Sequence, residues 1–173
     1  MTLKGEMMST VQDNILTRRT VYKFTDKDVP ESIINQALTA ASKAPCHKHT
    51  HPWKFYVLGP EIRSKLIPVI KKLAELKSIK LGSKDLEKDA ERAIKKIIQP
   101  PILIAITSKK DAEDKFREKE DYAATVCALH NMALSFWDNG IGSQWSSGSI
   151  TRDFDTYQLL SINQQTEEII QYV

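Results

Sequence analysis

Residues 42–58 have the sequence SKAPCHKHTHPWKFYVL, in which a basic, histidine-rich loop leads directly into an apolar segment. Pro45 opens the loop and Pro52 closes it, and the apolar run from Phe55 to Leu58 predicts a strand. The cationic or imidazole side chains of this region are Lys43, His47, Lys48, His49 and His51. Because proline at both ends restricts the backbone, we expect a stiff loop whose basic side chains can face a phosphate or a polarised ring.

Apolar periodicity divides the remaining sequence into helices and short strands of one domain, as a chain of 173 residues allows. Helices are predicted over residues 10–18, from Pro30 to before Pro45, over 61–98 with a break near Leu81-Gly82-Ser83, over 121–138, and over 151–160 with Thr151 as the cap. Further strands are predicted at 102–106, 141–145 and 168–173. Ile102 to Ile106 is apolar at every position, which is typical of a central strand buried on both faces.

Two of the predicted helical regions differ sharply in composition. The helix over 121–138 is apolar around most of its circumference, so we expect it in the core or in a subunit interface. The region 61–98 is rich in lysine offset by acidic residues, which favours a solvated surface. A role of that region in gating a substrate entrance is the alternative.

Composition excludes several classes of protein. A formal net charge of +3 gives little support to nucleic-acid binding, which usually concentrates a larger basic excess on one face. Cys46 and Cys127 are the only cysteines and do not make a disulfide framework. The first fourteen residues, MTLKGEMMSTVQDN, lack the apolar run of a signal peptide, and the apolar run Ile102 to Ile106 is too short to span a bilayer. We therefore expect a cytoplasmic protein with no membrane association.

Two further motifs carry groups suited to an anionic cofactor. Arg18-Arg19-Thr20 offers two guanidinium groups and a hydroxyl at the end of a predicted helix, a combination that binds phosphate well. Late in the chain, the turn Gly140-Ile141-Gly142 leads to Trp145-Ser146-Ser147-Gly148, which supplies backbone amides, two hydroxyls and an indole. Gly140 and Gly142 do not form a dinucleotide-binding fingerprint, because the sequence GxGxxG is absent.

Together with the loop APCHKHTHPWKF, these motifs resemble the nitroreductase family of flavin-dependent oxidoreductases, over roughly residues 10 to 173. Their order and spacing match those of the family, and the form of the loop is similar to that of its short bacterial members. The resemblance implies an α+β fold with a central mixed sheet flanked by helices, in a homodimer with FMN sites at the subunit interface. It also implies that the family's C-terminal tail is short or missing after Tyr172-Val173, which is expected to weaken FMN retention.

The resemblance also assigns residues and a reaction. The expected cofactor-binding residues are Arg18, Arg19, Thr20, Lys43, His47, Trp145, Ser146 and Ser147. Lys43 and His47 are expected to reach the flavin of the partner subunit. NADH or NADPH would pass a hydride to FMN, and a small acceptor such as a nitroaromatic or a quinone would then take it. No side chain is expected to act as a catalytic nucleophile or base, because the cofactor carries the chemistry.

Two alternatives remain open at the level of sequence. One is a flavin-binding store or redox sensor with little turnover. The other is a metal site formed by His47, His49 and His51, which would point to one side of an extended backbone. The absence of a nearby carboxylate to complete the coordination disfavours the metal site.

Overall fold

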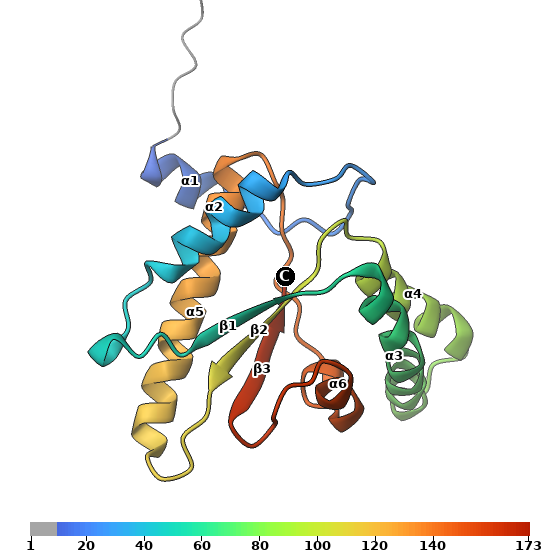
Figure 1. Cartoon of the computed structure of the whole chain (residues 1–173). Coiled ribbons are helices and arrows are strands. Elements are labelled where there is room, and N and C mark those ends of the chain that lie inside the picture. The colour runs from blue at the N-terminus through green and yellow to red at the C-terminus, as the bar shows by residue number, and fades with distance from the viewer. Residues whose placement is uncertain (1–9) are drawn as a thin grey trace, which may run out of the picture.

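A computed structural model describes residues 10–173, so most of the segment inspected for a signal peptide lies outside the described residues. The elements follow in the order α1 (Val11–Thr17), α2 (Glu31–Ser42), a 3₁₀ turn (His47–His49), β1 (Trp53–Val57), α3 (Pro60–Lys80), α4 (Leu86–Ile98), β2 (Ile104–Lys109), α5 (Lys115–Asp138), a second 3₁₀ turn (Ser149–Thr151), α6 (Phe154–Leu159) and β3 (Glu167–Tyr172). Helices surround a small sheet, which confirms the predicted α+β class (Figure 1).

The three strands form one sheet in the order β1-β2-β3, and both pairings are antiparallel. Phe55 lies opposite Ile106, and the register of the pairing with β3 shifts between Ile106 and Thr107. The resemblance implies a mixed sheet, and this expectation is wrong. Within residues 10–173 the parallel pairing is an isolated bridge between Thr20 and Ser143. The prediction of a central strand is confirmed, although β2 begins at Ile104 and continues to Lys109.

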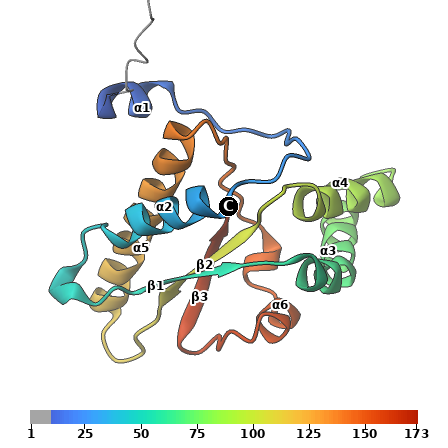
Figure 2. The same cartoon turned by 45° about the horizontal axis from the view of Figure 1, so that its top comes forward.

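Both faces of β2 are buried, and successive side chains enter two different apolar clusters. Ile104 and Ile106 pack with residues of α2 and α5, whereas Leu103 and Ala105 pack with residues of α3, α4 and α6. Figures 1 and 2 show the same arrangement, with α2 and α5 on one side of the sheet and α3, α4 and α6 on the other. A strand covered on both faces explains why its sequence is apolar without alternation.

Helix α5 begins at Lys115, earlier than the predicted start at Asp121. The signal is Asp114, whose carboxylate accepts a hydrogen bond from the backbone N–H of Arg117 at 2.9 Å and caps the helix. The added first turns are polar except for the exposed Phe116, so apolar periodicity could not reveal them. Asp121 itself is buried and pairs with Arg117 at 3.5 Å, one helical turn away.

Two local predictions near the C-terminus are wrong. Residues 141–145 are not a strand but an irregular segment, with one isolated bridge at Ser143 and a second just beyond it at Ser146. Thr151 does not cap the following helix, because its hydroxyl donates to the Gly148 carbonyl at 3.0 Å. Asp153 is the cap of α6 and accepts from the backbone N–H groups of Asp155 and Thr156. The last predicted strand is confirmed as β3.

A polar cluster joins all three strands around the Glu167 carboxylate. Lys54 Nζ lies 2.6 Å from Glu167 Oε1, and the hydroxyls of Tyr56 and Thr107 donate to Oε2 at 2.9 and 2.7 Å. Burial alone would raise the pKa of Glu167, but the hydrogen bonds from these three side chains outweigh it and hold the pKa below its ordinary value. The charged form of Glu167 is therefore stabilised by folding.

We expect Glu167→Gln to lower the free energy of unfolding at pH 7 by about 1 to 3 kcal/mol, since charge-assisted hydrogen bonds are lost. Because the folded pKa is depressed, this contribution is present above the ordinary carboxyl pKa of 4.5 and is lost as the pH falls below it. Urea unfolding of both proteins from pH 7 to pH 3 tests this, with the exposed neighbour Glu168→Gln as control. A difference between wild type and Glu167→Gln that does not shrink in acid would contradict the assignment.

Candidate functional site

The candidate site begins at the turn that ends α5. Gly140 adopts a positive φ of 72°, and its N–H donates to the Trp137 carbonyl at 3.0 Å. The N–H of Ile141 donates to the Phe136 carbonyl at 2.9 Å, which completes the glycine-dependent end of a helix. This turn directs the following segment away from the helix axis and toward the N-terminal part of the chain.

The segment after the turn is held between two distant parts of the sequence. The N–H of Val21 donates to the Ser143 carbonyl at 3.0 Å, and Thr20 and Ser143 form the parallel bridge. Three residues later, Ser146 and Tyr172 exchange two backbone hydrogen bonds of 2.9 and 3.0 Å. The structure thus brings Arg18-Arg19-Thr20 beside the segment that carries Trp145, Ser146 and Ser147.

Gly142 makes the close approach of these segments possible. A Cβ atom added at Gly142 would lie 3.0 Å from Val21 Cβ and 3.3 Å from Val21 Cγ1, and would overlap Cγ2. Any larger residue therefore requires the Val21 side chain or the two backbones to shift. A glycine is needed at position 142 for this close packing and not for a left-handed backbone conformation, since its φ is not positive.

The two arginines are placed differently. Arg19 Nη1 donates to the carbonyls of Leu16 and Arg18 at 2.8 and 2.9 Å, which anchors the side chain and leaves its Nε and Nη2 donors for other partners. The Arg18 side chain is half-buried and has no hydrogen-bond or ion-pair partner among residues 10–173. Both guanidinium groups retain donors for an anion.

The segment Trp145-Ser146-Ser147 presents hydrogen-bond donors and an aromatic surface. Trp145 is 46% exposed, Ser147 is exposed and Ser146 is half-buried. Serine hydroxyls can donate as well as accept, and no carboxylate belongs to this predicted set. The chemistry of the gathered residues therefore suits an acceptor-rich anion with a flat apolar part.

His47 does not join this group within one subunit, and Lys43 caps the C-terminal end of α2. The His47 carbonyl accepts from Arg117 Nη2 at 2.9 Å, and the Thr50 hydroxyl donates to Asp121 at 3.0 Å, so the loop is fixed near the start of α5. The turn at Gly140 lies beyond the other end of that helix (Figure 1). At about 1.5 Å per residue, the His47 loop and the Gly140 turn are roughly 30 Å apart along α5.

The histidine loop is not extended, which corrects the geometry assumed for a metal site. Lys48, His49 and His51 all have positive φ, at 52°, 52° and 43°, and residues 47–49 form a 3₁₀ turn. His51 packs edge-on against Trp53 at 5.5 Å between ring centroids, and its Nδ1 lies 3.8 Å from Cys46 Sγ. In residues 10–173, no group of three or more His, Cys, Asp or Glu side chains is arranged to hold a metal ion.

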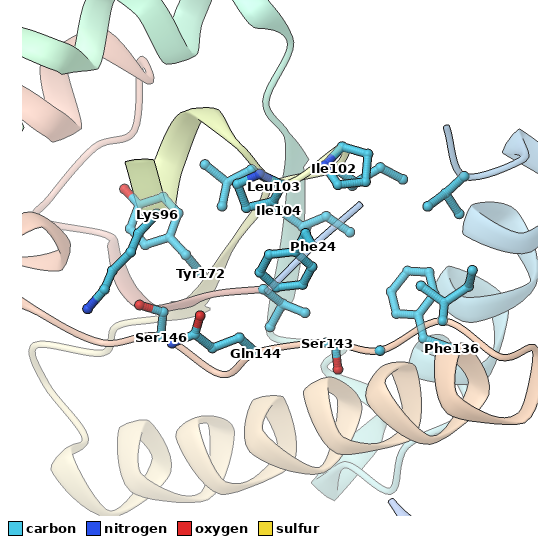
Figure 3. A pocket seen from close by; sticks show the side chains of 16 residues that line it. Phe24, Lys96, Ile102, Leu103, Ile104, Phe136, Ser143, Gln144, Ser146 and Tyr172 are labelled. Atoms are coloured by element: carbon cyan, nitrogen blue, oxygen red, sulfur yellow. The ribbon is translucent and has the colours of Figure 1, made fainter. Parts of the chain in front are cut away.

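Sequence reasoning missed Lys96 and Tyr172, which line two cavities that meet at Ser146. One cavity, of about 60 Å³, is mostly apolar and includes Phe24 and Phe136 in its lining (Figure 3). Lys96 gave no signal, because it is one of many lysines in a charged helix. Tyr172 resembled any apolar residue of a last strand.

The chain belongs to the nitroreductase family, whose model matches residues 15–173. A protein of Bacillus subtilis named "Putative NAD(P)H nitroreductase YfhC" is 29% identical over 167 residues, which cover 94% of this chain and 83% of that protein. A nitroreductase-like family protein from Bacillus cereus has a solved structure with a TM-score of 0.79 and 26% identity, covering 96% of this chain and 84% of that chain.

A more distant solved structure shares the fold. It is a nitroreductase-type protein from Desulfovibrio desulfuricans in complex with FMN, with a TM-score of 0.71 and 18% identity, covering 94% of this chain and 82% of that chain. Within residues 10–173, no helix has the length and apolar character needed to cross a membrane.

We expect Gly142→Ala to lower the free energy of unfolding by about 1 to 3 kcal/mol, because the added methyl group overpacks against Val21. The double variant Gly142→Ala, Val21→Ala should recover part of this loss, since it removes the atoms that clash. Chemical unfolding of both variants and of Val21→Ala alone measures the coupling. Additive losses would show that the two residues do not set the separation of these segments.

Proposed function

We propose that this protein is an FMN-dependent oxidoreductase that passes a hydride from NADH or NADPH, by way of bound flavin, to a nitroaromatic, quinone or similar acceptor in a two-step exchange. The observation that carries the proposal is the pairing of Thr20 with Ser143, which gathers two arginines and a serine-rich segment into one set of donors. Membership of the nitroreductase family supports a flavin oxidoreductase.

The residues present fit FMN by their chemistry. Arg18 and Arg19 have free guanidinium donors suited to a phosphate group, and the hydroxyl of Thr20 lies in the same stretch. Ser146 and Ser147 supply hydroxyl and backbone donors for the polar edge of a flavin, and the exposed indole of Trp145 supplies apolar surface. When bound, FMN supplies a ring that accepts and returns a hydride.

In this proposal, the side chains and backbone amides of the protein bind, orient and polarise the flavin. Donors directed at the polar edge of the flavin favour negative charge there, which favours acceptance of a hydride. No side chain of the set is required as a nucleophile or base. The relatives named as NAD(P)H nitroreductases motivate NADH or NADPH as the reductant.

We further propose that the working unit is a homodimer in which Lys43 and His47 serve the flavin bound by the partner subunit. The loop that holds His47 lies roughly 30 Å along α5 from the Gly140 turn, which favours a site shared between two subunits over one within a single subunit. Helix α1 has no buried residue and exposes Val11, Ile15 and Leu16 by 50 to 77%. Such an apolar helix surface beside the site is suited to a subunit contact.

We expect Arg18→Ala to weaken FMN binding about tenfold to a hundredfold, because a charge-assisted contact with phosphate is lost. The free energy of unfolding of this variant should change little, since the Arg18 side chain has no hydrogen-bond or ion-pair partner among residues 10–173. Fluorescence quenching during FMN titration measures the affinity, and Lys23→Ala, an exposed neighbour, is the control. Unchanged affinity in Arg18→Ala would remove this arginine from the flavin site.

Mixed dimers test whether the site crosses the subunit interface. Arg18→Ala and His47→Ala chains are coexpressed with different affinity tags, and only dimers carrying both tags are kept. In a cross-subunit arrangement, one of the two sites receives both native residues, so half of the sites should bind FMN with native affinity. If each site lay within one subunit, every site would be defective and no tight binding would appear. A stable monomer with native FMN affinity would also contradict the shared site.

A further inference from the structure

A second cavity, of about 390 Å³, lies between the α3/α4 pair and the loop that follows Ser146. Its volume falls within the range of pockets that bind small molecules. It touches the proposed flavin site at Ser146 and Ser147 and is otherwise formed by residues that have no place in that site. Helix α3 and helix α4 form one wall, the loop 146–150 the opposite wall, and Tyr172 belongs to both this cavity and its apolar neighbour.

The polar lining is predominantly basic. Lys77, Arg92 and Lys96 line the cavity, whereas Asp89 is its one acidic residue among the described residues. The Asp89 carboxylate is already occupied: the hydroxyls of Ser78 and Ser83 donate to it at 2.9 and 2.6 Å, and Arg92 lies 3.3 Å away. The two lysines have no ion-pair partner in residues 10–173, so the cavity retains an excess of positive charge.

Tyr172 adds a buried donor that lacks a partner. Its side chain is 1% exposed, and its hydroxyl has no hydrogen bond to any described residue. Burial raises the pKa of Tyr172 above its ordinary value, so the hydroxyl keeps its proton and can donate. In Figure 3 the ring lies near Lys96, with the hydroxyl on the side away from Phe24 and Ile102. A buried hydroxyl without a partner is unfavourable and is explained if a ligand supplies the acceptor.

The rest of the lining is apolar and suits a flat ring. Ile70 and Leu73 come from α3, Ala93 and Ile97 from α4, and Ile150 from the facing loop. A ligand that complements this cavity therefore needs an apolar body and an acceptor group of negative charge.

We propose that this cavity binds an aromatic carboxylate, with its ring among the apolar residues of α3 and α4 and its carboxylate facing the donors Lys96 and Tyr172. This inference concerns which acceptor the protein takes. It therefore rests on the proposed function, because the cavity adjoins the flavin site at Ser146 and Ser147. Acceptors that carry a carboxylate would then be preferred over neutral ones of the same size.

The test compares 4-nitrobenzoate with 4-nitrobenzyl alcohol, which has a similar ring and no charge. Isothermal titration calorimetry of the purified full chain, without reductant, measures binding apart from turnover. We expect the carboxylate to bind about tenfold or more tightly than the alcohol, as charge-assisted hydrogen bonds predict. Equal affinities in the unsubstituted protein would overturn the proposal.

Variants separate a binding role from a structural one. Tyr172→Phe keeps the ring and removes the unpaired hydroxyl, so it should weaken carboxylate binding about tenfold while the melting temperature holds or rises. Lys96→Gln should weaken the carboxylate and spare the alcohol, whereas Lys95→Gln, an exposed neighbour on α4 outside the cavity, should change neither. A destabilised Tyr172→Phe variant with native carboxylate affinity would show that the hydroxyl is structural and would contradict the assignment.

Failure of this inference is distinguishable from failure of the proposed function. Flavin content is read from the visible spectrum before each titration. Protein that binds FMN but does not discriminate the two ligands would refute the carboxylate site alone. Protein that binds no FMN but retains selective, Lys96-dependent carboxylate binding would support the cavity and refute the flavin enzyme. Release of FMN by 4-nitrobenzoate would show that the cavity is part of the flavin's own site and would overturn the inference.

Discussion

The burial of strand β2 on both faces is the constraint on which the rest of the structure depends. Five of its six residues are buried, with Lys109 as the exposed end. An antiparallel sheet can leave one face to solvent, but here helices α2 and α5 cover one face and α3, α4 and α6 cover the other. Each fully buried aliphatic side chain of this strand contributes about 1.5 to 3 kcal/mol, so both layers of helices are needed to realise that stabilisation.

Covering β2 also sets the geometry of the candidate site. Helix α5 contributes Leu129, Met132 and Phe136 to the core, and its two ends hold the functional segments. Near its start, Arg117 and Asp121 fix the histidine loop; at its end, the turn at Gly140 sends the chain to Thr20. The separation of the two halves of the proposed flavin site is therefore a consequence of how a long helix packs on the sheet. A second subunit is the simplest means of bringing the halves together.

Much of this arrangement could be predicted from the sequence, and the errors have physical causes. Continuous apolar residues identified β2, and periodicity identified α2 and the apolar part of α5. The polar first turns of α5 escaped because their signal was a single capping residue, Asp114. Residues 141–145 were mistaken for a strand because their composition suits one, whereas the segment is held by long-range bridges from Ser143 to Thr20 and from Ser146 to Tyr172. Motifs gave the candidate residues, and the fold adds that the His47 loop lies at the opposite end of α5 from the Gly140 turn. Tyr172 could not be found from sequence, because an unpaired hydroxyl is a property of its surroundings.

The most direct test of flavin-dependent oxidoreduction is the visible spectrum of the purified protein, recorded before and after NADH or NADPH is added without oxygen. We expect the absorption of oxidised flavin, or its appearance as a bound species after FMN is added, followed by bleaching with the reductant and recovery with a quinone or nitroaromatic. The Arg18→Ala variant should hold less flavin under the same conditions. A colourless protein that binds no added FMN would contradict the flavin site, and bound flavin that neither reductant bleaches would contradict the proposed turnover.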